Sequence, residues 1–151
     1  MICERALRAL RFLTIVVGLL AVSSPARAGT VLITEQEASL PPETVVASSR
    51  GITRGPRIEL VYPGETAHSP MHFQLRFKSF GGAGIDTGSL RVVYLKSPEI
   101  DITPRVARFA QPAGIDIPDA EIPAGEHYIR VEVADSEGRT RNSIFTLKIT
   151  P

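Results

Sequence analysis

Three side chains that could bind a soft metal ion lie close together in the stretch AHSPMHF, residues 67–73. They are His68, Met71 and His72, and copper accepts imidazole and thioether ligands. The alternation that follows, however, places His72 on the outer face of a strand and Met71 at the edge of a core. We therefore expect a polar turn that leads into a strand, and a copper site is the alternative.

A third histidine, His127, falls on the same face of an alternating strand as Ile129 and Val131. Alternation therefore predicts that its side chain points into the core. Pro123 and Gly125 place it at a corner, where an aromatic side chain of a β-sandwich hydrogen-bonds to loop backbone. We predict a structural role, because no base and nucleophile can be assigned beside it.

Motifs for catalysis and cofactor binding are missing from the sequence. There is no Gly-x-Ser-x-Gly, no phosphate-binding glycine loop, and no cysteine after Cys3. Asp116, Asp119 and Glu121 form the densest acidic group, and loop carboxylates of this kind can hold calcium. Aspartate is also common in turns because it caps local amides, so we favour a solvated turn. The sequence predicts a protein that is not an enzyme and has no cofactor.

Four side chains are candidates for contact with a partner. Arg50, Arg54 and Arg57 lie in or beside the stretch GITRGPR, where guanidinium groups could bind a phosphate or a carboxylate. Tyr128 is the tyrosine that alternation places most clearly in solvent. Arginines beside a flexible segment also keep a protein soluble, which is the alternative explanation for them.

The first 28 residues have the features of a signal peptide. Three arginines precede an apolar run from Phe12 to Val22, and Ala26-Arg27-Ala28 forms a cleavage site before Gly29. The run is shorter than the roughly 20 residues needed to cross a bilayer, so we expect no retained membrane span. We predict a periplasmic or secreted protein that comprises residues 29–151.

Removal of this segment changes the charge of the protein. The whole chain has 17 basic and 16 acidic residues. Four of the basic residues and one of the acidic residues lie in the predicted signal peptide. A formal charge of −2 remains, and this near-neutral balance argues against nucleic acid as a partner. The only cysteine is removed too, so stability has to come from apolar burial without an internal disulfide.

Residues 29–56 are predicted to form an extended leader that precedes the folded domain. The segment contains Pro41-Pro42, Ser48-Ser49 and two Arg-Gly pairs, which favour extended or mobile backbone. Thr34 and Glu37 have the spacing of a capping box, which predicts one helical turn. Residues 31–33 are apolar and would be exposed if nothing covered them, so an additional strand is possible there.

From residue 57 onward the apolar residues recur at every second position, which indicates half-buried antiparallel strands. The stretches are RIELVY (57–62), HFQLRFK (72–78), SLRVVYLK (89–96), HYIRVEVAD (127–135) and SIFTLKI (143–149), with shorter candidates at Val106–Phe109 and Ile115–Ile117. Gly, Pro and Asp occupy the breaks between them, as chain reversals require. About seven strands in residues 57–151 predict an all-β, antiparallel β-sandwich.

Two stretches resemble bacterial immunoglobulin-like domains. IPAGEHYIRVEVADSEGRTRNSIFTLKI (122–149) is similar to the last hairpin of such domains, and GIDTGSLRVVYL (84–95) is similar to a strand entry in their middle. The resemblance covers about residues 57–151 and implies an immunoglobulin-like sandwich. It implies little about function, because these modules serve adhesion, scaffolding, enzyme attachment and ligand binding alike.

The function that these observations favour is that of a non-enzymatic exported module for binding or scaffolding. Its partner would be a protein of the cell envelope, contacted through loops, through the leader or through an edge strand. The alternative is a periplasmic copper-binding protein similar to the CopC-like family, which is also immunoglobulin-like, with His68, Met71 and His72 as ligands. The ligand, the strand order and the oligomeric state do not follow from the sequence.

Overall fold

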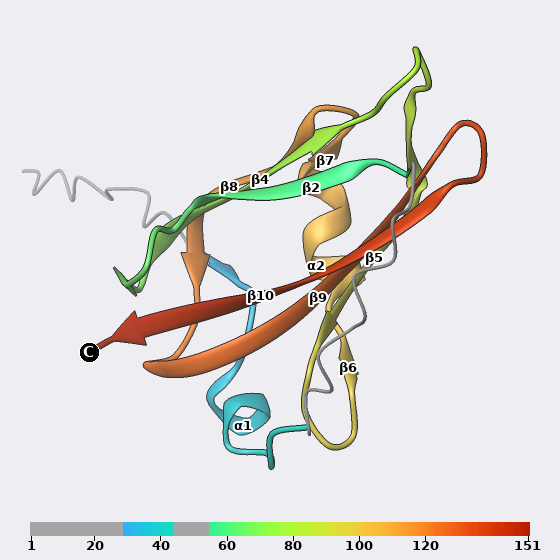
Figure 1. The fold of residues 1–151 in the computed structure, drawn as a ribbon. Coiled ribbons are helices and arrows are strands. Elements are labelled where there is room, and N and C mark those ends of the chain that lie inside the picture. The colour runs from blue at the N-terminus through green and yellow to red at the C-terminus, as the bar shows by residue number, and fades with distance from the viewer. Residues whose placement is uncertain (1–28, 44–54) are drawn as a thin grey trace, which may run out of the picture.

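The computed structural model describes residues 29–43 and 55–151, which form two β-sheets packed face to face (Figure 1). The strands of the described residues are β1 (Thr30–Val31), β2 (Arg57–Tyr62), β3 (Ala67–His68), β4 (Met71–Lys78), β5 (Ile85–Tyr94), β6 (Ile100–Asp101), β7 (Ala110–Gln111), β8 (Gly114–Glu121), β9 (Gly125–Asp135) and β10 (Thr140–Thr150). The helical turns are α1 (Glu35–Ala38), α2 (Thr103–Val106) and η1 (Ala107–Phe109). The predicted β-sandwich is confirmed, and the predicted signal peptide lies outside the described residues.

Each sheet contains five strands. The first has the order β1-β8-β4-β2, with β7 also paired to β8, and the second has the order β3-β10-β9-β5-β6. The long strands pair antiparallel, as expected, whereas the short edge strands β1 and β3 run parallel to β8 and β10. The sequence predicted about seven strands, because pairs of residues such as those in β3 and β6 are too short to show alternation.

The alternating stretches bury the side chains that the pattern predicts. Phe73, Leu75 and Phe77 of β4 are all at most 5% exposed, while the residues between them face outward. Ile129 and Val131 of β9 are completely buried against them in the same apolar core. Each such side chain contributes about 1.5–3 kcal/mol of transfer free energy, so this core is the main source of stability.

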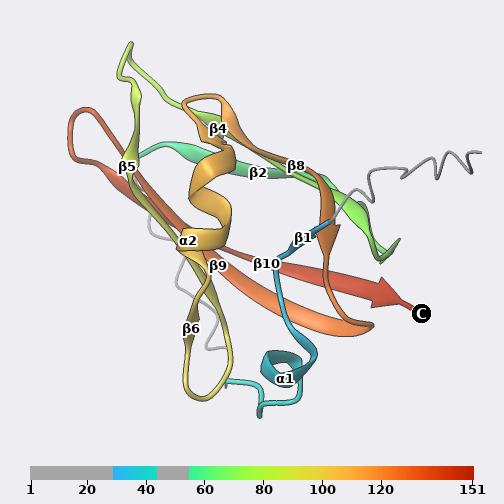
Figure 2. The ribbon, with the colours of Figure 1, turned by 180° about the vertical axis from the view of Figure 1, so that it is seen from behind.

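Residues 29–43 are part of the folded domain. The prediction that they form a leader outside the core is wrong. Leu32 and Ile33 are 0% and 2% exposed and belong to the core. Figure 2 shows β1 beside the end of β8, and the Leu32 amide continues this contact by donating to the Glu121 carbonyl at 2.9 Å. Residues 44–54, which include Arg50 and Arg54, lie outside the described residues.

An ion pair fixes this N-terminal segment, residues 29–43, to the sandwich. The predicted capping box is confirmed, since Thr34 and Glu37 each bind the other's backbone amide at the start of α1. Arg105 of α2 donates to both carboxylate oxygens of Glu37, at 2.6 and 2.8 Å, and to the Leu32 carbonyl at 2.9 Å. The hydrogen bonds from Arg105 lower the pKa of Glu37 to about 2, so the pair remains charged through the neutral range.

A second cation binds the other end of α1. The ammonium group of Lys96, a residue only 8% exposed, donates to the carbonyls of Ala38 and Leu40 at 2.7 and 2.8 Å. Carbonyls at the end of a helix lack intrahelical partners, and a cation there stabilises them. Lys96 also lies over the ring of Tyr94, 5.4 Å from its centroid, so the segment is joined to the core by polar as well as apolar contacts.

The short apolar run at Val106–Phe109 was predicted as a strand, and the structure shows helical turns there instead. Val106 and Phe109 are three residues apart, a spacing that also suits a helix. The period of the apolar residues therefore does not distinguish a strand from a helix in this run. Pro104 in the first turn favours the helix, and the Asp101 carboxylate accepts the Thr103 amide at 2.9 Å just before it. The other short candidate, Ile115–Ile117, is confirmed as part of β8.

We predict that Leu32→Ala lowers the free energy of unfolding by about 2–5 kcal/mol, because it leaves a cavity in the core. The matched control is Val31→Ala, since Val31 is 45% exposed and its truncation should cost less than about 1 kcal/mol. Urea denaturation of the two variants and the parent protein measures both values. Equal stability of L32A and the parent would show that the N-terminal segment does not contribute to the core.

Candidate functional site

The structure does not bring the three predicted copper ligands together. Met71 is 6% exposed and packs in the core, which confirms its predicted place. The His68 ring lies beside the end of β10, with Nδ1 3.1 Å from the Pro151 carbonyl oxygen and 3.0 Å from Oγ1 of Thr150. His72 points to the outer face of β4, as predicted. Among the residues that the structure describes, no group of three or more His, Cys, Asp or Glu side chains could hold a metal ion.

His72 belongs to an exposed polar cluster on the outer face of the first sheet. Its Nε2 lies 2.8 Å from Oδ1 of Asp116, and the amide of Gln74 donates to Oδ2 of the same carboxylate at 3.0 Å. The ring of Tyr62 stacks on the imidazole, with 5.1 Å between centroids. The His72 and Asp116 side chains are 42% and 55% exposed, so their interaction contributes little to stability. Asp116 thus bonds to neighbouring strand residues and forms no cation site with Asp119 and Glu121.

His127 occupies the buried corner that the sequence predicted. It is 2% exposed, and its Nε2 lies 2.8 Å from the carbonyl oxygen of Pro123. A carbonyl only accepts, so Nε2 carries the hydrogen, and Nδ1 then accepts the hydroxyl of Tyr94 at 2.8 Å. Burial lowers the pKa of His127, and the charge of Lys96 lowers it further, which keeps the imidazole neutral. Burial also raises the pKa of Tyr94 to about 12, so the phenol remains a donor.

The candidate contact residues do not form one surface. Arg57 is exposed on β2, where its guanidinium lies 3.5 Å from the Glu59 carboxylate, whereas Tyr128 is on β9 in the other sheet. Tyr128 is partly buried, and Tyr62 is the more open tyrosine at 51%. Alternation missed Tyr62 because the register of β2 with β4 shifts between Leu60 and Tyr62.

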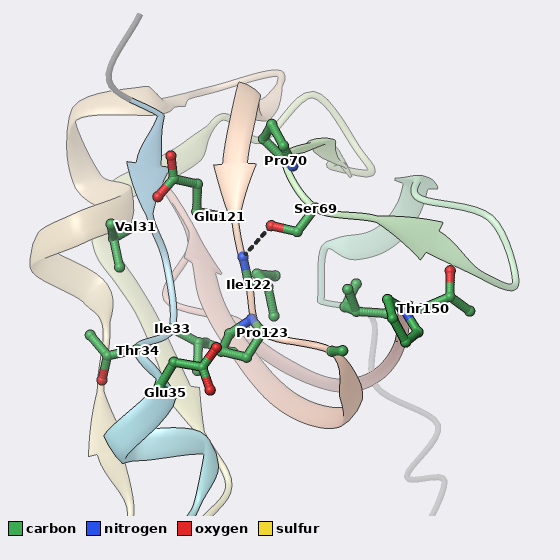
Figure 3. Close-up of a pocket in the computed structure, with 13 residues that line it drawn as sticks. Val31, Ile33, Thr34, Glu35, Ser69, Pro70, Glu121, Ile122, Pro123 and Thr150 are labelled. Atoms are coloured by element: carbon green, nitrogen blue, oxygen red, sulfur yellow. Dashed lines mark hydrogen bonds between the residues drawn. The ribbon is translucent and has the colours of Figure 1, made fainter. Parts of the chain in front are cut away.

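The described residues form a groove of about 530 Å³ beside the N-terminal segment. We call it the seam groove, because it lies where β8 of one sheet leads into β9 of the other. Figure 3 shows Val31–Glu35 on one side, Thr150 on the other, and Ile122 and Pro123 between them. Its lining comprises Val31, Ile33, Thr34, Glu35, Ser69, Pro70, Glu121, Ile122, Pro123, Ala124, Ile149, Thr150 and Pro151.

The seam groove combines an apolar floor with negative charge. Its two ionisable side chains are the carboxylates of Glu35 and Glu121, and no Lys, Arg or His is part of the lining. Ser69 accepts the Ile122 amide at 3.1 Å, so this backbone donor in the floor is already satisfied. The sequence contained no signal for this site, because four segments distant along the chain form it.

Comparisons with known proteins do not assign the chain to a family. No family model matches it, and no curated protein matches it. A search of solved structures finds a likeness to CopC from Methylosinus trichosporium OB3b, at 18% identity and a TM-score of 0.41. That match covers 63% of this chain and 95% of CopC. At this TM-score and identity, the likeness carries no conclusion about function. Among the described residues, no helix has the length and hydropathy that a membrane span requires.

We predict that Cu²⁺ or Cu⁺ changes the melting temperature of the protein by less than about 1 °C, because a ligand stabilises a fold only when it binds the folded state. His72→Ala should leave this result unchanged, since the His72 ring bonds to the carboxylate of Asp116, which is not a soft ligand. Thermal unfolding with and without one equivalent of metal measures the effect. A one-to-one stabilisation that His72→Ala abolishes would restore the copper hypothesis.

We predict that protonation of His127 destabilises the fold in mild acid. Its folded-state pKa lies below the ordinary value of 6.5, so below about pH 6.5 the unfolded chain takes up a proton that the folded protein does not. Stability should therefore fall as the pH decreases through about 6.5, by at most about 1.4 kcal/mol per pH unit for this one group. His127→Gln retains a donor and an acceptor without titrating, and should flatten this part of the profile. Parallel slopes for the two proteins between pH 7 and pH 5 would contradict the assignment.

Proposed function

We propose that the chain is a non-enzymatic exported binding module of immunoglobulin-like fold, and that the seam groove is its contact surface. Its partner would be an extended segment of another protein of the cell envelope, with apolar side chains and at least one basic residue. The immunoglobulin-like class is supported by the resemblance of residues 84–95 and 122–149. Export is supported by the basic, apolar and small-residue pattern of residues 1–28.

The observation that carries the proposal is that the seam groove lies between the ends of the two sheets. Strand β1 ends the first sheet and β3 ends the second, and both are only two residues long. Segments on either side of the groove thus continue from edge strands, which can accept a further extended strand. Val31 adds an exposed apolar side chain to the wall. This combination suits an extended peptide better than a compact ligand.

The charge of the groove indicates which peptide it would prefer. Glu35 is exposed, and Figure 3 shows its carboxylate on the side of the N-terminal segment that faces Pro123. With no cation among the lining residues, a lysine or arginine of the partner would meet this carboxylate without competition. A charge at the rim of an interface mainly sets specificity and the rate of association.

A catalytic role has less support. The seam groove holds two carboxylates and the hydroxyls of Ser69, Thr34 and Thr150, without a histidine or lysine to activate a nucleophile. The copper-binding alternative also has less support, because its three ligands lie in three different environments. The suggested contacts of Arg50 and Arg54 fall outside the described residues and stay predictions.

The proposal can be tested with blocked five-residue peptides in which valine alternates with lysine, glutamate or serine. The isotope-labelled protein is titrated with each peptide, and amide chemical shifts locate the contact. We expect shifts at residues 31–35 and 122–124, and an affinity for the lysine peptide about fivefold or more above that for the glutamate peptide.

Two variants complete this experiment. Glu35→Lys should reverse the preference between the lysine and glutamate peptides, whereas Glu65→Lys should not, because Glu65 is exposed outside the groove lining. Shifts confined to another surface, or no saturable binding of any of the three peptides, would reject the groove as the contact surface. An unchanged preference in Glu35→Lys would reject the role of Glu35.

A further inference from the structure

Gly29 lies against the carboxylate of Glu121. A Cβ atom added to this glycine would stand 2.3 Å from Oε1 of Glu121, closer than real Cβ contacts come. The contact follows from strand pairing, because Gly29 directly precedes β1 and the next residues, Thr30 and Val31, pair with Ala120 and Glu121. Figure 3 shows the Glu121 carboxylate directed toward β1 and away from Pro123.

Nearby cations are already bonded to other groups. Arg108 donates to the hydroxyl of Thr30 at 2.9 Å, and Arg105 is occupied by Glu37 and the Leu32 carbonyl. In the part of the chain that the structure describes, the Glu121 carboxylate has no ion pair or side-chain hydrogen bond. A carboxylate held against the backbone at this place would be stabilised by a positive charge.

We propose that cleavage after Ala28 provides this charge, and that the α-ammonium group of Gly29 is the ion-pair partner of Glu121. Hydrolysis by a signal peptidase breaks the Ala28–Gly29 C–N bond. The hydroxyl of water becomes part of the new Ala28 carboxylate, and the Gly29 nitrogen takes up protons to become an ammonium. An α-amino group has a pKa of about 7.7–8.0, so it is mostly charged at neutral pH.

The geometry allows the pair to form without moving the backbone. The nitrogen of a residue lies about 2.5 Å from its own Cβ position, so the Gly29 nitrogen is at most about 4.8 Å from Oε1 of Glu121. Rotation of the Glu121 side chain can shorten this to a hydrogen bond. In the uncleaved chain the same nitrogen is a neutral amide, so only the processed protein would have the ion pair. It would hold the start of β1 to the end of β8, whatever the seam groove binds.

The test compares four proteins: the chain beginning at Gly29, the same chain with Ala28 retained, and Glu121→Gln in each. The pKa of the α-amino group is measured from the chemical shift of the first residue's Cα during a pH titration. We expect the pKa in the Gly29 form to be about 0.5–1 unit higher than in its E121Q variant. With Ala28 retained, E121Q should change the α-amino pKa by less than about 0.2 unit, because the amine is one residue farther away.

Two further measurements separate the ion pair from other effects. Glu35→Gln in the Gly29 form is the matched control, since it removes the other carboxylate of the groove lining, and it should leave the α-amino pKa unchanged. Intact-mass measurement of the exported protein should show a chain that begins at Gly29. An equal α-amino pKa with and without Glu121, or an exported chain that begins elsewhere, would overturn the proposal. Neither outcome affects the peptide-binding test of the seam groove.

Discussion

The fold depends on covering the apolar core at the seam between the two sheets. Leu32 and Ile33 provide this cover, and both are almost completely buried although they precede the long strands by more than 20 residues. Apolar surface left open at this edge would cost roughly 25 cal/mol per Å². The N-terminal segment is therefore a structural part of the sandwich, and its position also forms one wall of the seam groove. Stability and the candidate contact surface thus depend on the same few residues.

Polar groups that are wholly or partly buried then fix the position of the N-terminal segment. Arg105 joins Glu37 and the Leu32 carbonyl, while Lys96 binds the carbonyls at the end of α1. Such groups are costly to bury unless each is paired, and here the pairs tie the segment to one position. Tyr94 and His127 extend the polar contacts from the core to the Pro123 carbonyl, which lines the seam groove. The shape of the groove floor is therefore coupled to buried hydrogen bonds and not only to surface loops.

Much of the fold followed from alternation, and the failures have physical causes. Strands β4 and β9 were predicted because buried residues alternate with more open ones over many positions of each strand. The burial of His127 and the exposure of His72 followed from the same argument. Val106–Phe109 was predicted wrongly because a run of four residues fits both a strand and a helical turn. Residues 29–43 were misjudged because their prolines and polar residues resemble a linker, and local composition cannot show that Leu32 meets a distant edge.

The sequence by itself determined the β-sandwich, the outward or inward direction of most strand side chains, and the neutral balance of charge. These properties are local, since they depend on the period of apolar residues and on the turn residues between them. Only the tertiary structure decided that the His68 ring lies beside the end of β10, and that Glu35 and Glu121 line one groove. It also decided that Glu121 meets Gly29. These contacts join residues far apart along the chain, and the order in which the strands pair, which alternation does not encode, brings them together.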